Sequence, residues 1–151
     1  MISTALAGSL KSPALLLDAG FVAGEWLATA EGGKTFDVLN PSTGDVLATL
    51  PDMGIPETKR AIDVAYATQV AWAKRTGKDR GAVLRKLFDL MIENADDLAT
   101  ILTAEMGKPL AEAKGEIIYG ASYVEWFAEE AKRIYGDIIP GHQPDKRIMV
   151  L

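Results

Sequence analysis

Few side chains in this chain of 151 residues could form or break covalent bonds. There is no cysteine, so disulfide bonds, thiolate metal sites and a cysteine nucleophile acting within this chain are excluded. The single histidine, His142, lies in a run rich in proline and glycine, where a solvated loop residue is the simpler interpretation. No glycine-rich phosphate loop, dinucleotide fingerprint or HExxH zinc motif occurs. The residues by themselves therefore predict no self-contained active site.

Two tyrosines and a few carboxylates remain as candidates for binding. Tyr119 and Tyr123 are four residues apart, so an expected helix would place them on one face, off its apolar stripe. They could pack as an aromatic patch against another layer, or present hydroxyl groups to a ligand. Glu105 precedes a run that a helix end at Gly107 and a new helix at Pro109 largely explain. A solvated helix face is the simpler interpretation of the glutamates further on: Glu112, Glu116, Glu125, Glu129 and Glu130.

Composition excludes several classes of protein. Apolar residues make up 48% and charged residues 25%, which is an ordinary globular mixture and argues against disorder of the whole chain. The net charge is −5 and no dense basic run occurs, so we expect no nucleic-acid partner. No apolar run approaches the roughly 18 residues of a membrane helix. The first 20 residues lack the pattern of a secretory signal, so we expect a cytoplasmic protein.

Short strands are predicted in the N-terminal third. After a loosely ordered extension with a helical turn near residues 14–18, strands are expected at residues 21–27, 35–39 and 46–50. Glycines 32 and 33 allow a reversal between the first two strands, and residues 40–45 are a run of turn formers before the third. Three strands in succession predict an antiparallel meander.

The pattern then becomes helical, and two helices follow one another. Pro56 suits the first turn of a helix that is expected to end near Gly77 as its C′ residue. Asp79 is the expected N-cap of the second helix. Within that helix, Arg85 and Asp89 have the spacing of a favourable ion pair.

Two further helices are predicted before the C-terminal segment. Asn94 is expected to cap a short helix that ends at Gly107. Pro109 then opens a long helix, whose apolar residues recur at steps of three and four through Ile134 until Gly136 ends it.

The C-terminal residues predict a β-hairpin. Residues 137–139 and 147–151 are expected to be strands, and the last four, from Ile148 to Leu151, are apolar in succession. A strand that is apolar on both faces must be covered on both, and an uncovered apolar edge favours aggregation. We therefore expect a chain that is incomplete by itself. Its fold class is α+β, with short antiparallel strands, four helices and a C-terminal hairpin.

Several runs resemble the N-terminal part of the aldehyde dehydrogenases, most closely the bacterial succinate-semialdehyde branch. The resemblance extends from about Leu10 onward. Superfamily features are Gly24-Glu25-Trp26, Asn40-Pro41-Ser42-Thr43-Gly44 and Trp72. The branch is indicated by Glu105-Met106-Gly107-Lys108-Pro109, Glu112-Ala113-Lys114-Gly115-Glu116-Ile117, the run of residues 125–137, and Ile139-Pro140-Gly141-His142-Gln143.

The resemblance implies a three-domain α/β enzyme that oxidises succinate semialdehyde to succinate with NAD or NADP. In this family a cysteine thiolate attacks the aldehyde, an asparagine and a backbone N–H hold the oxyanion, and a glutamate activates the deacylating water. All of these residues, and the cofactor domain, are expected beyond residue 151. The chain alone is therefore expected to bind no cofactor and to be inactive.

The resemblance also implies roles for particular residues. It places Tyr119, and with it Tyr123, at the wall of the substrate tunnel. It places a monovalent cation between the Glu105 carboxylate and the backbone carbonyl of Leu39, since hard cations prefer oxygen ligands. The hairpin is expected to be an oligomerisation arm in a homo-oligomer, with its contacts through Ile138, Ile148 and Val150.

The expected domain organisation follows from these assignments. Residues 1–20 are an N-terminal extension, 21–135 the strands and four helices beside the cofactor domain, and 136–151 the truncated start of the arm. Two alternatives remain open. The chain could be a non-catalytic, truncated paralogue that acts as an assembly module, or a helical binding domain unrelated to the dehydrogenases.

Overall fold

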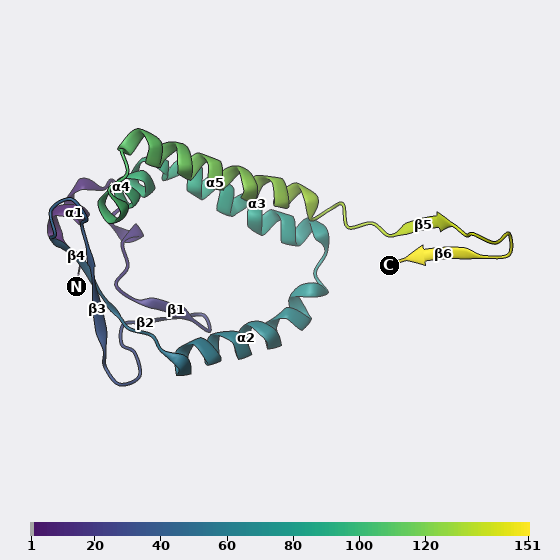
Figure 1. Cartoon of the computed structure of the whole chain (residues 1–151), viewed down its shortest axis with the longest axis horizontal. Coiled ribbons are helices and arrows are strands. Elements are labelled where there is room, and N and C mark those ends of the chain that lie inside the picture. Colours follow the sequence, from purple (N-terminus) through teal and green to yellow (C-terminus); the bar gives the residue numbers. More distant parts are fainter. Residues whose placement is uncertain (1) are drawn as a thin grey trace.

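The computed structural model describes residues 2–151, and helices supply most of its regular structure (Figure 1). In chain order the elements are α1 (Thr4–Ser9), a 3-10 turn (Pro13–Leu15), β1 (Gly20–Val22), β2 (Glu25–Leu27), β3 (Thr35–Leu39), β4 (Val46–Pro51), α2 (Ile55–Ala73), α3 (Gly77–Glu93), α4 (Ala95–Met106), α5 (Leu110–Glu130), β5 (Asp137–Pro140) and β6 (Arg147–Val150). This is the predicted α+β class, with the short α1 added to the four expected helices. No helix within residues 2–151 combines the length and apolar character that crossing a bilayer requires.

β1 and β2 form a hairpin where the sequence predicted one strand over residues 21–27. Phe21 pairs with Trp26, and their ring centroids are 4.9 Å apart. Ala23 and Gly24 both have positive φ, at 57° and 87°. A two-residue type I′ turn requires positive φ at both central positions. The prediction of one strand was wrong because Gly24 completes a tight turn.

β3 and β4 form a second hairpin, which the predicted turn at residues 40–45 closes. The predicted reversal also exists, since Gly32 and Gly33 have positive φ. β2 and β3, which flank this reversal in the chain, do not pair with each other, however, because the strands described pair as β1–β2, β3–β4 and β5–β6. The backbone N–H of Glu31 donates instead to the Glu57 carboxylate on α2. The expected meander was therefore wrong, since this loop is bound to a helix.

The junction between α2 and α3 also differs from the prediction. Thr76, rather than Asp79, is the N-cap of α3, and its hydroxyl oxygen accepts the Asp79 backbone N–H at 3.1 Å. Gly77 is the first residue of α3 and not the C′ residue of α2. A Cβ atom at Gly77 would clash with the carbonyl oxygen of Ala131, so the end of α5 requires a glycine there.

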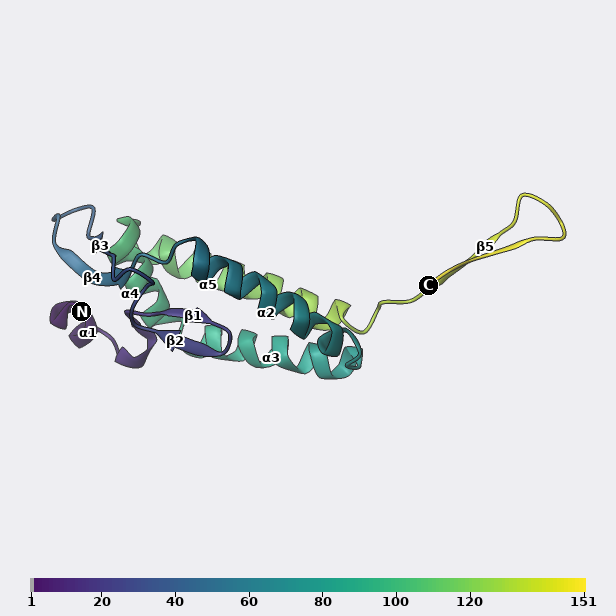
Figure 2. The ribbon, with the colours of Figure 1, turned by 90° about the horizontal axis from the view of Figure 1, so that it is seen from below.

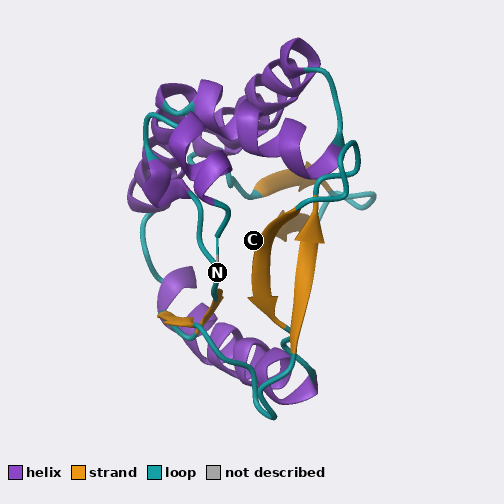
Figure 3. Ribbon diagram, turned by 90° about the vertical axis from the view of Figure 1, so that its left-hand side faces the viewer, coloured by secondary structure: helices purple, strands orange, loops and turns teal. Residues whose placement is uncertain are grey.

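Small residues form the core between α3, α4 and α5. Ala99 on α4 and Ala113 and Ala121 on α5 are completely buried. On α3, a Cβ at Gly81 would lie 2.6 Å from the Ala128 carbonyl oxygen. Close helix packing therefore depends on small side chains. Figure 3 shows α3, α4 and α5 gathered on one side, with α2 apart from them on the other.

α5 ends sooner than its apolar pattern predicts. The helix stops at Glu130, and Ile134 is 75% exposed. The backbone N–H groups of Lys132 and Arg133 bond carbonyls three residues back, which tightens the chain into a turn. The step of three to four residues continued past the helix end because it records only apolar spacing. By contrast, α4 ends as predicted at Gly107, whose φ is 79°.

The N-terminal extension is more ordered than predicted. It contains α1, and the helical turn expected near residues 14–18 lies at residues 13–15. Leu6 and Leu10 are buried, and the backbone N–H of Ser3 donates to the Leu47 carbonyl at 2.8 Å. The extension therefore packs on the rest of the chain.

Candidate functional site

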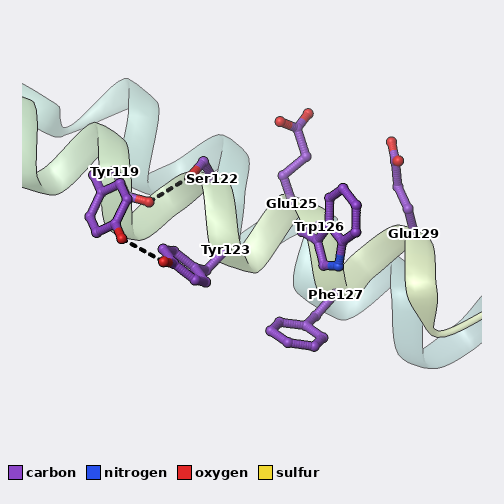
Figure 4. Close-up of a pocket in the computed structure, with 7 residues that line it drawn as sticks. All are labelled: Tyr119, Ser122, Tyr123, Glu125, Trp126, Phe127 and Glu129. Carbon is purple, nitrogen blue, oxygen red and sulfur yellow. Dashed lines mark hydrogen bonds between the residues drawn. The ribbon is translucent and has the colours of Figure 1, made fainter.

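A recess of about 670 Å³ runs along α5 (Figure 4). Because one helix supplies all of its lining, the recess is open to solvent. Figure 4 shows Tyr119, Tyr123 and Phe127 pointing to one side of the helix, away from the carboxylates of Glu125 and Glu129. The full lining is Tyr119, Ser122, Tyr123, Glu125, Trp126, Phe127 and Glu129.

The two predicted tyrosines are brought together at this site. Their hydroxyl oxygens are 2.5 Å apart, and the rings meet edge to face with centroids separated by 5.0 Å. This hydrogen bond, with a smaller contribution from burial, raises the pKa of Tyr123 because both favour the neutral phenol. One hydroxyl donates to the other, so the second hydroxyl keeps its proton for an outside acceptor. The pair can therefore offer an O–H donor to a carboxylate or carbonyl oxygen.

Arg85 on α3 balances the negative side of the recess. Its guanidinium lies 2.8 Å from Glu125 and 3.6 Å from Glu129. The hydrogen bond with Glu125 is the main cause that raises the pKa of Arg85. The ion pairs of Arg85 therefore run between helices, whereas the sequence predicted a pair with Asp89 along α3. This contact ties α3 to the helix that carries the tyrosines.

Spacing alone could have identified further residues of this recess. Trp126 and Phe127 lie seven and eight residues after Tyr119, about two helical turns, so they lie on the same side of the helix as Tyr119. They are 62% and 57% exposed. Neither residue was predicted from the sequence as part of a binding site. Large aromatic residues on a helix surface were the available signal.

The predicted cation ligands lie on neighbouring segments. Leu39 is the last residue of β3, and Glu105 lies in the last turn of α4. Directly after these elements, a Cβ at Gly107 would be 3.1 Å from Pro41, so the two segments run close together. Among the described residues no group of three or more histidine or carboxylate side chains is placed to hold a metal ion. A cation site between Glu105 and the Leu39 carbonyl stays a prediction.

The sheets described do not fit a dinucleotide cofactor. Nucleotides bind α/β folds in a crevice at the carboxyl ends of parallel strands, beside a glycine-rich turn. Each sheet within residues 2–151 has two antiparallel strands. We therefore assign no residue of this chain to a cofactor.

The predicted arm residues lie on a hairpin that projects from the helices (Figures 1 and 2). β5 pairs with β6 in a register that sets Ile138 opposite Met149 and Ile139 opposite Ile148. Paired residues share a face and successive residues alternate, so both faces of the hairpin are apolar. Ile138 is 74% exposed and Val150 46%. The helices therefore do not cover these side chains.

Comparison with known proteins gives consistent matches. Residues 26–151 match the model of the aldehyde dehydrogenase family. The chain is 58% identical over 142 residues to the glutarate-semialdehyde dehydrogenase of Pseudomonas putida, covering 94% of this chain and 29% of that protein. It is 58% identical over 128 residues to the NADP(+) succinate-semialdehyde dehydrogenase of Escherichia coli, covering 85% and 26%.

A solved structure shows the same arrangement. The succinate-semialdehyde dehydrogenase from Burkholderia pseudomallei superposes with a TM-score of 0.88 and 54% identity, over 94% of this chain and 29% of that one. The chain therefore spans under a third of the length of the relatives it matches. Since the family model covers most of the chain and the fold agrees, this chain belongs to the aldehyde dehydrogenase family.

Proposed function

We propose that this chain is the N-terminal part of an NAD(P)-dependent dehydrogenase that oxidises a short aldehyde carrying a carboxylate, with succinate semialdehyde as the first candidate. The observation that supports this most is the identity of 54–58% to dehydrogenases named for succinate or glutarate semialdehyde. The family resemblance implies a cysteine nucleophile, and this chain has none. We therefore place the nucleophile in the remaining part of the enzyme. We expect the enzyme to act in the cytoplasm.

The role that we propose for α5 is to form one wall of the substrate tunnel. The paired hydroxyls of Tyr119 and Tyr123 can donate one hydrogen bond outward, and the surrounding aromatic rings can contact the aldehyde's methylene groups. Lysine and arginine do not occur among the seven residues that line this recess. A substrate carboxylate would therefore meet hydroxyl donors on this wall.

A chimera tests the proposed function directly. The matching N-terminal residues of the Pseudomonas putida relative are replaced by those of this chain, and reduced nicotinamide is followed by absorbance. We expect turnover of succinate or glutarate semialdehyde. A folded chimera that binds the nucleotide but oxidises neither aldehyde would contradict the proposal.

Tyr119→Phe together with Tyr123→Phe in the same chimera tests the tunnel wall, because either hydroxyl alone could still donate to the substrate. Tyr66→Phe on α2 is the control, since Tyr66 is exposed and far along the chain from the recess. We expect KM for succinate semialdehyde to rise about tenfold, as for one lost hydrogen bond to a charged group, and KM for butanal to stay the same. Equal changes for both aldehydes would contradict a contact with the carboxylate.

The chain alone is expected to be inactive. It lacks the nucleophile that the family mechanism requires and the parallel sheet that would hold a nucleotide. Reduced nicotinamide formed above background by the purified 151-residue chain would refute this.

We also propose that the β5–β6 hairpin is an arm through which copies of the enzyme assemble. Its two apolar faces and its projection away from the helices support this role. The truncated-paralogue alternative uses the same arm, and the reading frame downstream of residue 151 distinguishes the two: continuation into a cysteine motif would support the enzyme, and a stop codon with retained expression would support the paralogue.

A further inference from the structure

Residues 2–16, here called the strap, run from β4 to the start of α4. Ser3 donates its backbone N–H to the Leu47 carbonyl, and Ile2 forms a bridge with Ala48. Leu47 lies where the β3–β4 register shifts, so its carbonyl points outside the ladder and is available to the strap. The strap therefore covers part of the outer edge of β4.

At its other end the strap is held by the Asp97 carboxylate. Oδ1 accepts the backbone N–H of Lys11 at 3.1 Å, and Oδ2 accepts that of Ser12 at 2.7 Å. Asp97 is only 4% exposed, and with Glu57 it is one of two buried charged residues in the part of the chain described. Each carboxylate oxygen thus accepts one backbone N–H, and the two N–H groups belong to consecutive residues. Charge-assisted bonds of this kind are stronger than neutral ones.

Asp96 stands beside this contact but holds the strap differently. It is exposed, and it forms ion pairs with the side chains of Lys11 at 3.3 Å and Lys114 at 2.5 Å. Exposed ion pairs contribute little because water screens them. Asp96 is therefore a matched control for Asp97, adjacent in sequence and identical in charge.

Between these two ends the strap has few attachments of its own. Its buried side chains are Leu6 and Leu10. The short helix α1, which carries Leu6, contacts α4. A segment with so little buried apolar area opens at a lower free energy than the helical core. Its two attachments lie on different elements, β4 and α4, and the buried Leu6 and Leu10 lie between them.

We propose that the strap opens and closes as one unit, with the Asp97 carboxylate as its latch, and that the closed strap shields the edge of β4. An uncovered strand edge can pair with another strand. The latch thus controls whether β4 is available for such pairing. This is a conformational device within the chain, and it does not depend on the proposed enzymatic function.

Cleavage by trypsin after Lys11 measures opening of the latch, because Asp97 holds the backbone N–H groups of Lys11 and Ser12 on this peptide bond and next to it. Asp97→Asn keeps the size of the side chain but turns one acceptor into an NH₂ group that faces a backbone donor. We expect cleavage at Lys11 to be about tenfold faster in this variant, the factor for one charged hydrogen bond. Asp96→Asn should stay within about twofold of the original chain.

Amide hydrogen exchange provides the second measurement, and it tests the single unit in the original chain without a variant. If the strap is one unit, the amides of Ser3, Lys11 and Ser12 should share one protection factor, well below that of Ala121 in the core. Unequal protection at the two ends would overturn the single unit. Unchanged cleavage in Asp97→Asn, or equal acceleration by Asp96→Asn, would overturn the latch. So would a loss of protection in Asp97→Asn that is as large at Ala121 as at Ser12.

Discussion

Glu57 shows how one carboxylate can join two elements. Oε2 accepts the N–H of Gly54 at the start of its own helix at 3.0 Å, while Oε1 accepts that of Glu31 from the loop before β3. The bond from Glu31 is the main cause that lowers the pKa of Glu57, and burial opposes it. The carboxylate therefore stabilises the fold only while it is ionised.

Replacing Glu57 by Gln should reveal a pH-dependent part of the stability. Because the pKa is lower in the folded chain, the contribution is fully present above the unfolded pKa and disappears as pH falls through the folded one. We expect the variant to unfold at lower urea than the original chain at pH 7, with the difference shrinking between about pH 5 and pH 3. A difference that is constant over this range would contradict the assignment.

Two helical glycines should respond in opposite ways to alanine. A Cβ at Gly81 would lie 2.6 Å from the Ala128 carbonyl, whereas nothing lies within 4 Å of one at Gly115. We expect Gly81→Ala to destabilise the chain by about 1–3 kcal/mol through overpacking. Gly115→Ala should stabilise it by about 0.5–1 kcal/mol through helix propensity. Urea unfolding midpoints measure both, and a shift in the same direction would refute the close α3–α5 contact.

At the scale of elements, the β5–β6 hairpin and α5 before it differ in how the rest of the chain supports them. α5 packs against α3 and α4, whereas the strands within residues 137–151 pair with one another and extend away from the helices. A two-stranded hairpin alone is marginally stable in water. An apolar partner surface would supply the missing stabilisation.

Val150→Asp should therefore weaken assembly of a chimera that carries this arm. A charge placed in an apolar interface is left without a partner, at a cost of about 2–5 kcal/mol. We expect smaller species in sedimentation velocity, with Asp145→Asn, an exposed residue in the turn of the hairpin, as the control. An unchanged oligomer with normal activity would contradict the arm as an interface.

At the scale of the whole molecule, large apolar side chains remain on the surface. Ile55, Ile62, Tyr66 and Val70 on α2 are each more than 60% exposed, and α2 stands apart from the other long helices. Exposed apolar patches of this kind mark surfaces that bind something else. The completely buried residues described are alanines, so much of the chain's apolar surface is left for other contacts.

The 151-residue chain should bind a hydrophobic dye in its native state. We expect dye fluorescence in buffer to exceed that of a monomeric globular control of equal size, because the apolar face of α2 is uncovered. Ile62→Glu with Val70→Glu should reduce the signal without changing the helical circular dichroism. Absence of dye binding by a cooperative, soluble monomer would contradict the exposed faces.

Local chemistry was enough to predict the parts of this fold that depend on neighbours in the chain. The turn at residues 40–45, the end of α4 at Gly107 and the strands of the C-terminal hairpin follow from φ preferences and short-range hydrogen bonds. The spacing of Tyr119 and Tyr123 also predicted that they share a face. Motif resemblance predicted the family.

Only the tertiary structure decided the features that depend on partners far along the chain. Glu31 bonds α2 instead of continuing a meander, Arg85 pairs with α5 instead of its own helix, and Asp97 holds the strap 85 residues away. For Arg85 the sequence offered a local alternative, Asp89, four residues further along the same helix. The alternative that is realised depends on which donor or charge the packing of other elements brings within hydrogen-bond distance, and periodicity along one segment carries no information about that.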